Sequence, residues 1–82
     1  MPVTYDRETD ALYVRLPDTE HVAIDSQKIL DDVRIIDYSA AGAVVGIEFL
    51  DASEGIDLTD VPFASIVEDQ IDQSGQTFKV FA

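Results

Sequence analysis

The chain has 82 residues, five of them Lys or Arg and seventeen Asp or Glu, a net charge of −12, no cysteine and one histidine. This length fits a single domain spanning residues 1–82. Nucleic acids and anionic membranes are bound by clustered basic residues, so we expect neither as a direct partner. The absence of cysteine excludes disulfides and thiolate chemistry. No apolar run is long enough to span a bilayer and no signal-peptide pattern opens the chain, which predicts a cytoplasmic protein.

The acidic bias has three possible causes: a basic protein partner, divalent cations bound by carboxylates, or adaptation to high salt. Aspartate outnumbers glutamate twelve to five, and only two lysines are present. We favour adaptation to high salt, because strong screening makes self-repulsion of such a surface inexpensive. The charge would then describe the environment of the protein rather than its activity.

Alternating apolar residues predict a first hairpin, with strands over residues 1–5 and 12–16 and a polar loop over 7–10. A four-residue loop makes every inward residue face an inward partner. The predicted pairs are Tyr5 with Leu12, Val3 with Val14, and Met1 with Leu16. Pro17 then ends the second strand. A short third strand is predicted over 21–24, followed by a polar connection over 26–32.

A second hairpin is predicted from the apolar runs 33–38 and 44–50. The loop Ala40-Ala41-Gly42 fits a type I turn in which Gly42 takes the left-handed conformation, with Ser39 and Ala43 as the closing pair. Counting outward gives two faces. Ile35 opposes Ile47 and Val33 opposes Phe49 on one face; Tyr38 opposes Val44, Ile36 opposes Gly46 and Arg34 opposes Glu48 on the other. Gly46 is interpreted as leaving bare backbone beneath Ile36.

In the last third of the chain, the spacing of apolar residues changes from the alternation of strands to the four-residue spacing of a helix. Ile56 and Leu58 are predicted to be an extended anchor. Pro62 begins a helix over residues 62–74, on which Phe63, Val67 and Ile71 form an apolar stripe. Gly75 is a C-terminal stop, and alternation over 77–81 predicts a final strand.

These elements predict a small α+β domain: an antiparallel sheet of two hairpins plus short strands, with one C-terminal helix packed on one face. The second face keeps apolar residues where an exposed sheet should be polar. We therefore predict that a homodimer or another protein partner covers it, with a candidate interface of Tyr13, Ile36, Tyr38 and Val44. The alternative is that the last strand or segment 17–32 folds across this face.

Carboxylates are the only abundant reactive groups. Asp6 and Asp10 flank the first loop, and Asp37 and Glu48 lie in the second hairpin, but the spacing of a calcium loop is absent. His21 is a lone histidine without a partner for metal binding or nucleophilic catalysis. We expect no catalytic residue, no metal site and no cofactor. The alternative function, from another class, is a carboxylate-based divalent-metal-binding or hydrolytic protein, with Asp6, Asp10 and Glu48 as its ligands.

Several segments together resemble the domain-of-unknown-function family DUF2283: Val3-Thr4-Tyr5-Asp6, Thr9-Asp10-Ala11-Leu12-Tyr13-Val14, Ile36-Asp37-Tyr38, Gly42, and Val44 to Ser53. The likeness covers residues 1–55, a family-like β core. Residues 56–82, the helix and final strand, resemble an extension in relatives from salt-loving archaea. The family is small and prokaryotic, and it implies no activity and no catalytic residues. Ser39-Ala40-Ala41 departs from the acidic turn of relatives, which disfavours a metal at that tip.

The function we expect is a non-enzymatic protein-interaction domain that self-associates, with a regulatory or antitoxin-like role as a special case. An acidic antitoxin would suit a basic partner, but it normally carries a disordered segment, whereas residues 54–82 have the pattern of an ordered one.

Overall fold

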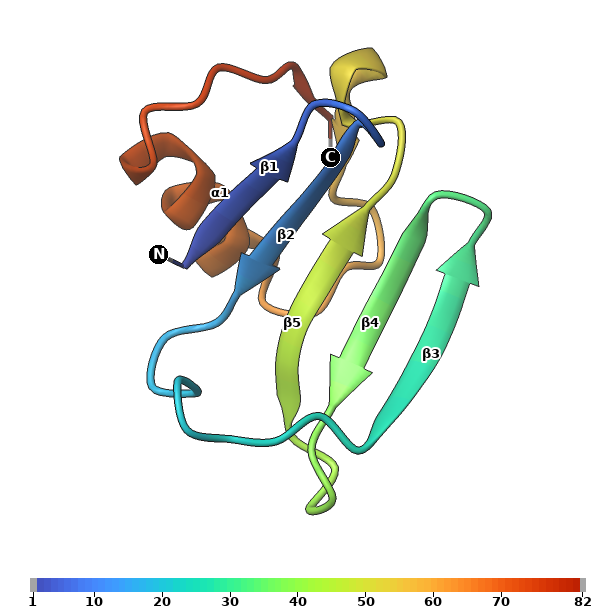
Figure 1. The fold of residues 1–82 in the computed structure, drawn as a ribbon, viewed down its shortest axis with the longest axis vertical. Helices are drawn as coiled ribbons and strands as arrows, with labels where there is room; N and C mark the ends of the chain where they lie inside the picture. Colours follow the sequence, from blue (N-terminus) through green and yellow to red (C-terminus); the bar gives the residue numbers. More distant parts are fainter. Residues whose placement is uncertain (1, 82) are drawn as a thin grey trace.

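A computed structural model describes residues 2–81 and shows a five-stranded antiparallel sheet with one α-helix (Figure 1). The sheet has the spatial order β1-β2-β5-β4-β3. Its strands are β1 (Val3–Asp6), β2 (Ala11–Arg15), β3 (Ser26–Asp31), β4 (Arg34–Tyr38) and β5 (Val44–Phe49). The predicted α+β class is confirmed.

The chain after β5 forms a second layer on one face of the sheet (Figure 1). It contains a 3-10 turn η1 (Ala52–Glu54), β6 (Ile56–Asp57), α1 (Ala64–Gln73) and β7 (Val80–Phe81). Strands β6 and β7 form a short parallel pair. The predicted final strand is thus present but only two residues long, and it lies in the second layer rather than across the other face.

The first hairpin has the predicted register. Val3 lies opposite Val14 and Tyr5 opposite Leu12, and Val3, Leu12 and Val14 are buried. The predicted pair of Met1 with Leu16 lies outside the described residues. The hydrophobic pattern therefore fixed this register, because a slip of one residue would have turned all these side chains to the opposite face.

The second hairpin begins as predicted and then departs from the prediction. Ser39 donates its N–H to Ala43 at 2.8 Å, Gly42 has φ 84°, and Tyr38 lies opposite Val44. The register then shifts, because Asp37 lies opposite Gly46 and leaves Val45 as an extra residue in β5. Such a β-bulge reverses the faces of all residues beyond it.

The bulge makes the predicted inner and outer faces of β4 wrong. Ile36 lies opposite Ile47 and is buried, whereas Ile35 lies opposite Glu48 on the other face. Arg34 lies opposite Phe49, so the predicted charge pair of Arg34 with Glu48 is also wrong. A bulge inserts one residue without changing composition, so counting outward from the turn could not reveal it.

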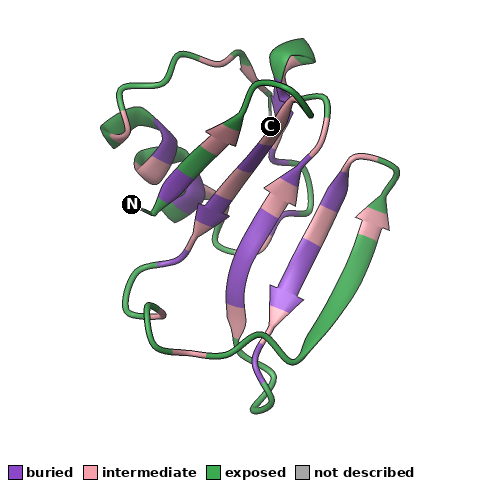
Figure 2. Cartoon of the chain, in the orientation of Figure 1, coloured by how far each residue is buried: buried purple, intermediate pink, exposed green. Residues whose placement is uncertain are grey.

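The third strand was predicted in the wrong place. Residues 21–24 are not in a strand, and β3 (Ser26–Asp31) occupies the segment predicted as a polar connection. β3 is an edge strand that pairs only with β4, and most of its residues are exposed (Figure 2). Because most side chains of this edge strand are exposed, its sequence does not need alternating apolar residues, and the pattern used to predict strands is weak there.

The helix is confirmed but shorter than predicted. Val67 and Ile71 are buried against the sheet, while Phe63 precedes the first helical residue and is 56 % exposed. The predicted stripe is therefore wrong for Phe63. Gly75, with φ 78°, follows the helix end as predicted.

One hydrophobic core lies between the sheet and the second layer. It includes the predicted anchor residues Ile56 and Leu58. Its other buried members come from all layers: Val3, Leu12, Val14, Leu16, Ile36, Ile47, Phe49, Ala52, Val61, Val67 and Ile71. Within residues 2–81, no helix has the length and apolar character needed to cross a membrane.

Candidate functional site

The face of the sheet turned away from α1 is covered by no helix or strand of residues 2–81 (Figure 1). Cross-strand partners share a face, so the register identifies the residues of this open face. One row crosses all five strands, namely Thr4, Tyr13, Glu48, Ile35 and Ile29. The next row is Arg15, Gly46, Asp37 and Gln27. Segment 16–25 runs along the end of the sheet, where its Thr19 and Val22 carbonyls accept hydrogen bonds from Arg15 (Figure 1).

The four predicted interface residues do not share this face. Tyr13 lies on the open face, whereas Ile36 is buried in the core. Tyr38 and Val44 are half-buried and pack against the same core. The prediction of a contiguous patch of these four residues is therefore wrong, and the reason is the bulge in β5.

Two apolar residues of the open face escaped the sequence prediction. Ile29 is the most exposed large hydrophobic residue within 2–81, at 73 %, and it lies opposite the half-buried Ile35. These two residues form an apolar pair at the β3–β4 side of the row, and Glu48 separates this pair from Tyr13. The signal that could have found Ile29 is the apolar pair Ile29-Leu30 within the otherwise polar segment Ser26 to Asp31.

A polar cluster lies beside this row. The Tyr13 hydroxyl donates to Asp37 at 2.8 Å, and the Gln27 amide donates to the other carboxylate oxygen at 2.8 Å. Asp37 is only 3 % exposed, although it lies on the open face. Each carboxylate oxygen of Asp37 therefore accepts a hydrogen bond from one of these donors, as a buried carboxylate requires.

The absence of a side chain at Gly46 leaves room for the Tyr13 ring. A Cβ atom at Gly46 would lie 2.6 Å from Tyr13 Cζ, closer than van der Waals contact allows. The predicted role of Gly46 beneath Ile36 is wrong, because its partner is the Tyr13 ring on the opposite face. The missing side chain allows the ring to cross β5 and reach Asp37.

The Tyr13–Asp37 pair has the properties of a fixed contact. Burial, and secondly the hydrogen bond to Asp37, raise the pKa of the Tyr13 phenol above its ordinary value. The phenol thus stays protonated near neutral pH and acts as a donor. The hydrogen bond thus holds the Tyr13 ring in one orientation on the open face.

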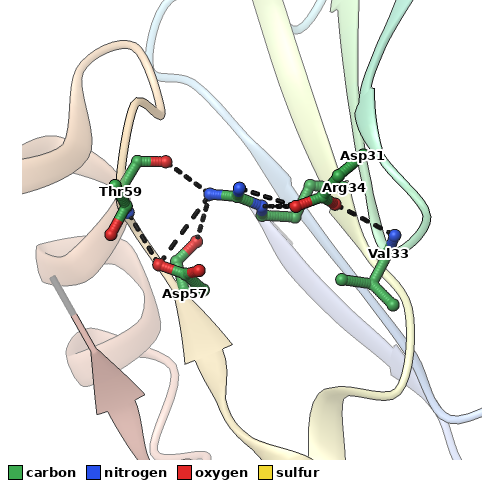
Figure 3. Close-up of polar contacts among 5 residues, drawn as sticks. All are labelled: Asp31, Val33, Arg34, Asp57 and Thr59. Atoms are coloured by element: carbon green, nitrogen blue, oxygen red, sulfur yellow. Dashed lines mark hydrogen bonds and ion pairs between the residues drawn. The ribbon is translucent and has the colours of Figure 1, made fainter.

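A second polar cluster ties the sheet to the opposite layer, and Figure 3 shows its five residues. The Arg34 guanidinium is buried, donates to Asp31 at 2.7 and 3.0 Å, and also donates to the backbone carbonyls of Asp57 and Thr59. Hydrogen bonds from Arg34, and then from the Val33 N–H, lower the pKa of Asp31. This cluster has a structural role, because every group is paired within it.

A third cluster fixes the loop after β5. Asp10, with φ 55°, accepts hydrogen bonds from the Tyr5 hydroxyl at 2.6 Å, the Ser53 hydroxyl at 2.6 Å and the Ser53 N–H at 2.9 Å. The bonds from Ser53, and then from Tyr5, lower the pKa of Asp10. The carboxylate predicted as a possible metal ligand is thus used to join two loops.

The remaining predicted ligands lie apart from a common centre. Asp6 accepts the N–H groups of Glu8 and Thr9 within its own turn, and Glu48 lies mid-strand on the open face. Among residues 2–81, no three His, Asp or Glu side chains are close enough to hold a metal ion together. His21 lies exposed in segment 16–25.

Comparison with known protein families gives a match for the sheet. The model of a family described as "Protein of unknown function (DUF2283)" matches residues 3–53, which span the whole sheet and the loop fixed by Asp10. No curated protein and no solved structure matches the chain.

Proposed function

The chain belongs to the DUF2283 family, and we propose that it is a non-enzymatic interaction domain that forms a homodimer through the open face of its sheet. The observation that carries this proposal is the presence of three large apolar or aromatic side chains, Tyr13, Ile35 and Ile29, on a face that no helix or strand of residues 2–81 covers. Glu48 lies between Tyr13 and Ile35 in the same row. Exposed apolar rows on antiparallel sheets are typical of interfaces.

The polar cluster supports the same proposal. A side chain held by hydrogen bonds before binding loses less conformational freedom when a partner arrives. Tyr13 is held by Asp37, and Asp37 is held by Gln27, across strands β2, β4 and β3. The open face therefore offers a rigid aromatic residue at its centre, and aromatic residues are enriched among the energetically important contacts of interfaces.

The size of the face predicts the strength of the contact. Five strands about 4.8 Å apart and about five residues long give a footprint of roughly 19 by 17 Å. This flat footprint is smaller than that of a standard specific interface, so we expect a weak dimer whose population depends on concentration. The net charge of −12 adds repulsion, which suits a protein that works in a cytoplasm of high salt.

Sedimentation velocity with two matched variants tests the proposal. Ile29→Lys places a charge on the open face, and Ile66→Lys places the same charge on an exposed position of α1. We expect Ile29→Lys to abolish the dimer, even though it lowers the net negative charge, and Ile66→Lys to leave it intact. A wild-type monomer at every salt concentration, or equal loss in both variants, would overturn the proposal.

A further inference from the structure

A groove on the other side of the molecule is not used by the proposed dimer. It lies between the start of α1, the segment that follows β2 and the β4–β5 turn, and it has a volume of about 450 Å³. Its walls are mainly apolar, and they include Leu16, Pro17, Val44, Phe63 and Ile66. This is within the range of volumes that hold a bound side chain or small ligand.

Phe63 at the edge of this groove has an unusual conformation. It is 56 % exposed and has φ 56°, a left-handed conformation that is costly for a bulky residue. Phe63 is less than half buried, so its packing offsets only part of that cost. Backbone strain of this kind is concentrated at binding and functional sites.

The groove continues along the helix. A second hollow of about 280 Å³ shares Leu16 and Pro17 with the first and extends to Glu20 and Gln70. From Phe63 to Gln70 the helix rises by roughly 10 Å. The combined groove therefore has room for a short peptide segment rather than for a single side chain alone.

The charges beside the groove determine the kind of segment. Asp18 lines the first hollow and Glu20 the second. The acids of α1 line neither hollow, and α1 carries no basic residue. The one basic residue in the lining is Arg15, whose guanidinium already donates to the carbonyls of Thr19 and Val22. Complementarity of charge thus favours a basic ligand.

We propose that this groove binds a short basic segment of a partner protein, with one large apolar side chain of that segment packed against Phe63. The conformation of Phe63 keeps its ring at the groove instead of in the core. The site is separate from the open face, and its failure would leave the proposed dimer untouched.

Fluorescence anisotropy with a labelled amphipathic peptide of leucine and lysine tests this proposal in the full chain at moderate salt. We expect Phe63→Gly to weaken binding by roughly tenfold or more, as the loss of an aromatic anchor does. Because glycine adopts φ 56° without strain, this variant should unfold at the same or a higher urea concentration than the wild type. Ile66→Lys should weaken binding similarly, whereas Ile29→Lys on the open face should not.

Three outcomes would overturn the proposal. Equal binding by Phe63→Gly would show that the ring is not a contact. Equal binding of a peptide with the same composition in scrambled order would show attraction by charge alone. Loss of the dimer in Phe63→Gly, without loss of peptide binding, would assign the groove to a second copy of the chain.

Discussion

The Tyr13 hydroxyl reaches across β5 and donates a 2.8 Å hydrogen bond to the Asp37 carboxylate, which lies 24 residues further along the chain. This contact joins β2 to β4 over the bare backbone of Gly46. It also gives the open face its fixed aromatic residue, on which the proposed interface depends.

Tyr13→Phe should therefore destabilise the fold, because Asp37 would lose one of its two side-chain donors while remaining buried. Hydrogen bonds to buried charged groups contribute about 1.5–3 kcal/mol, and we expect a loss in the free energy of unfolding of that size. Urea denaturation measures it. Tyr38→Phe is the control, and an equal loss in both variants would show that the Asp37 contact has no special role.

Arg34→Ala should lower the free energy of unfolding strongly, because this one buried side chain makes several hydrogen bonds. It removes the donor shared by Asp31 and the carbonyls of Asp57 and Thr59, and with it the polar link between β4 and the second layer. We expect a loss of about 3 kcal/mol in the free energy of unfolding. Arg7→Ala, in the exposed first turn, is the matched control. A change in the urea midpoint no larger than that of this control would contradict the assignment.

The sequence predicted those features that depend on local pattern. The first hairpin, the Gly42 turn and the helix followed from alternation, turn chemistry and a four-residue period. The bulge at Val45 could not be predicted, because an inserted residue leaves no compositional trace. Because of this extra residue, Ile36 faces the core and not the open face where it was expected.

The candidate site was predictable only in part. Tyr13 was identified, but Ile29 was not, because β3 resembles a polar loop. The Tyr13–Asp37 and Arg34 contacts join residues distant in sequence, and only the tertiary fold brings them together. The DUF2283 resemblance marked the right segments without saying what they contact.

Acid should weaken the fold through Asp10. Its folded-state pKa lies below the ordinary aspartate value, so its stabilising effect is full above about pH 4 and is lost as the pH falls through the lower folded value. Asp31 and Asp57 have pKa values lowered in the same direction. Asp10→Asn should therefore show a shallower decline of the urea midpoint between about pH 5 and pH 2. Asp69→Asn removes the same charge from α1, and an equally shallow decline there would refute the role of Asp10.

Salt should strengthen self-association. Each copy carries a net charge of −12, and the proposed contact relies on the apolar side chains of Ile29, Ile35 and Tyr13. Raising salt from about 0.1 M to about 1 M shortens the Debye length from about 10 Å to about 3 Å, which reduces repulsion and leaves apolar contact unopposed. Light scattering should show the dimer fraction rising over this range. A dimer that dissociates as salt rises would require ion pairs at the interface instead.

The most direct test of the open face as a dimer interface is paramagnetic relaxation between copies. The chain has no cysteine, so Thr4→Cys gives one spin-label position at the β1 edge of the open face. Mixed with a ¹⁵N-labelled wild-type chain at high salt, this label should broaden the amide signals of β2, β4 and β3 in the other copy. Broadening confined to α1 and its groove, or none under conditions where dimers are present, would contradict the account.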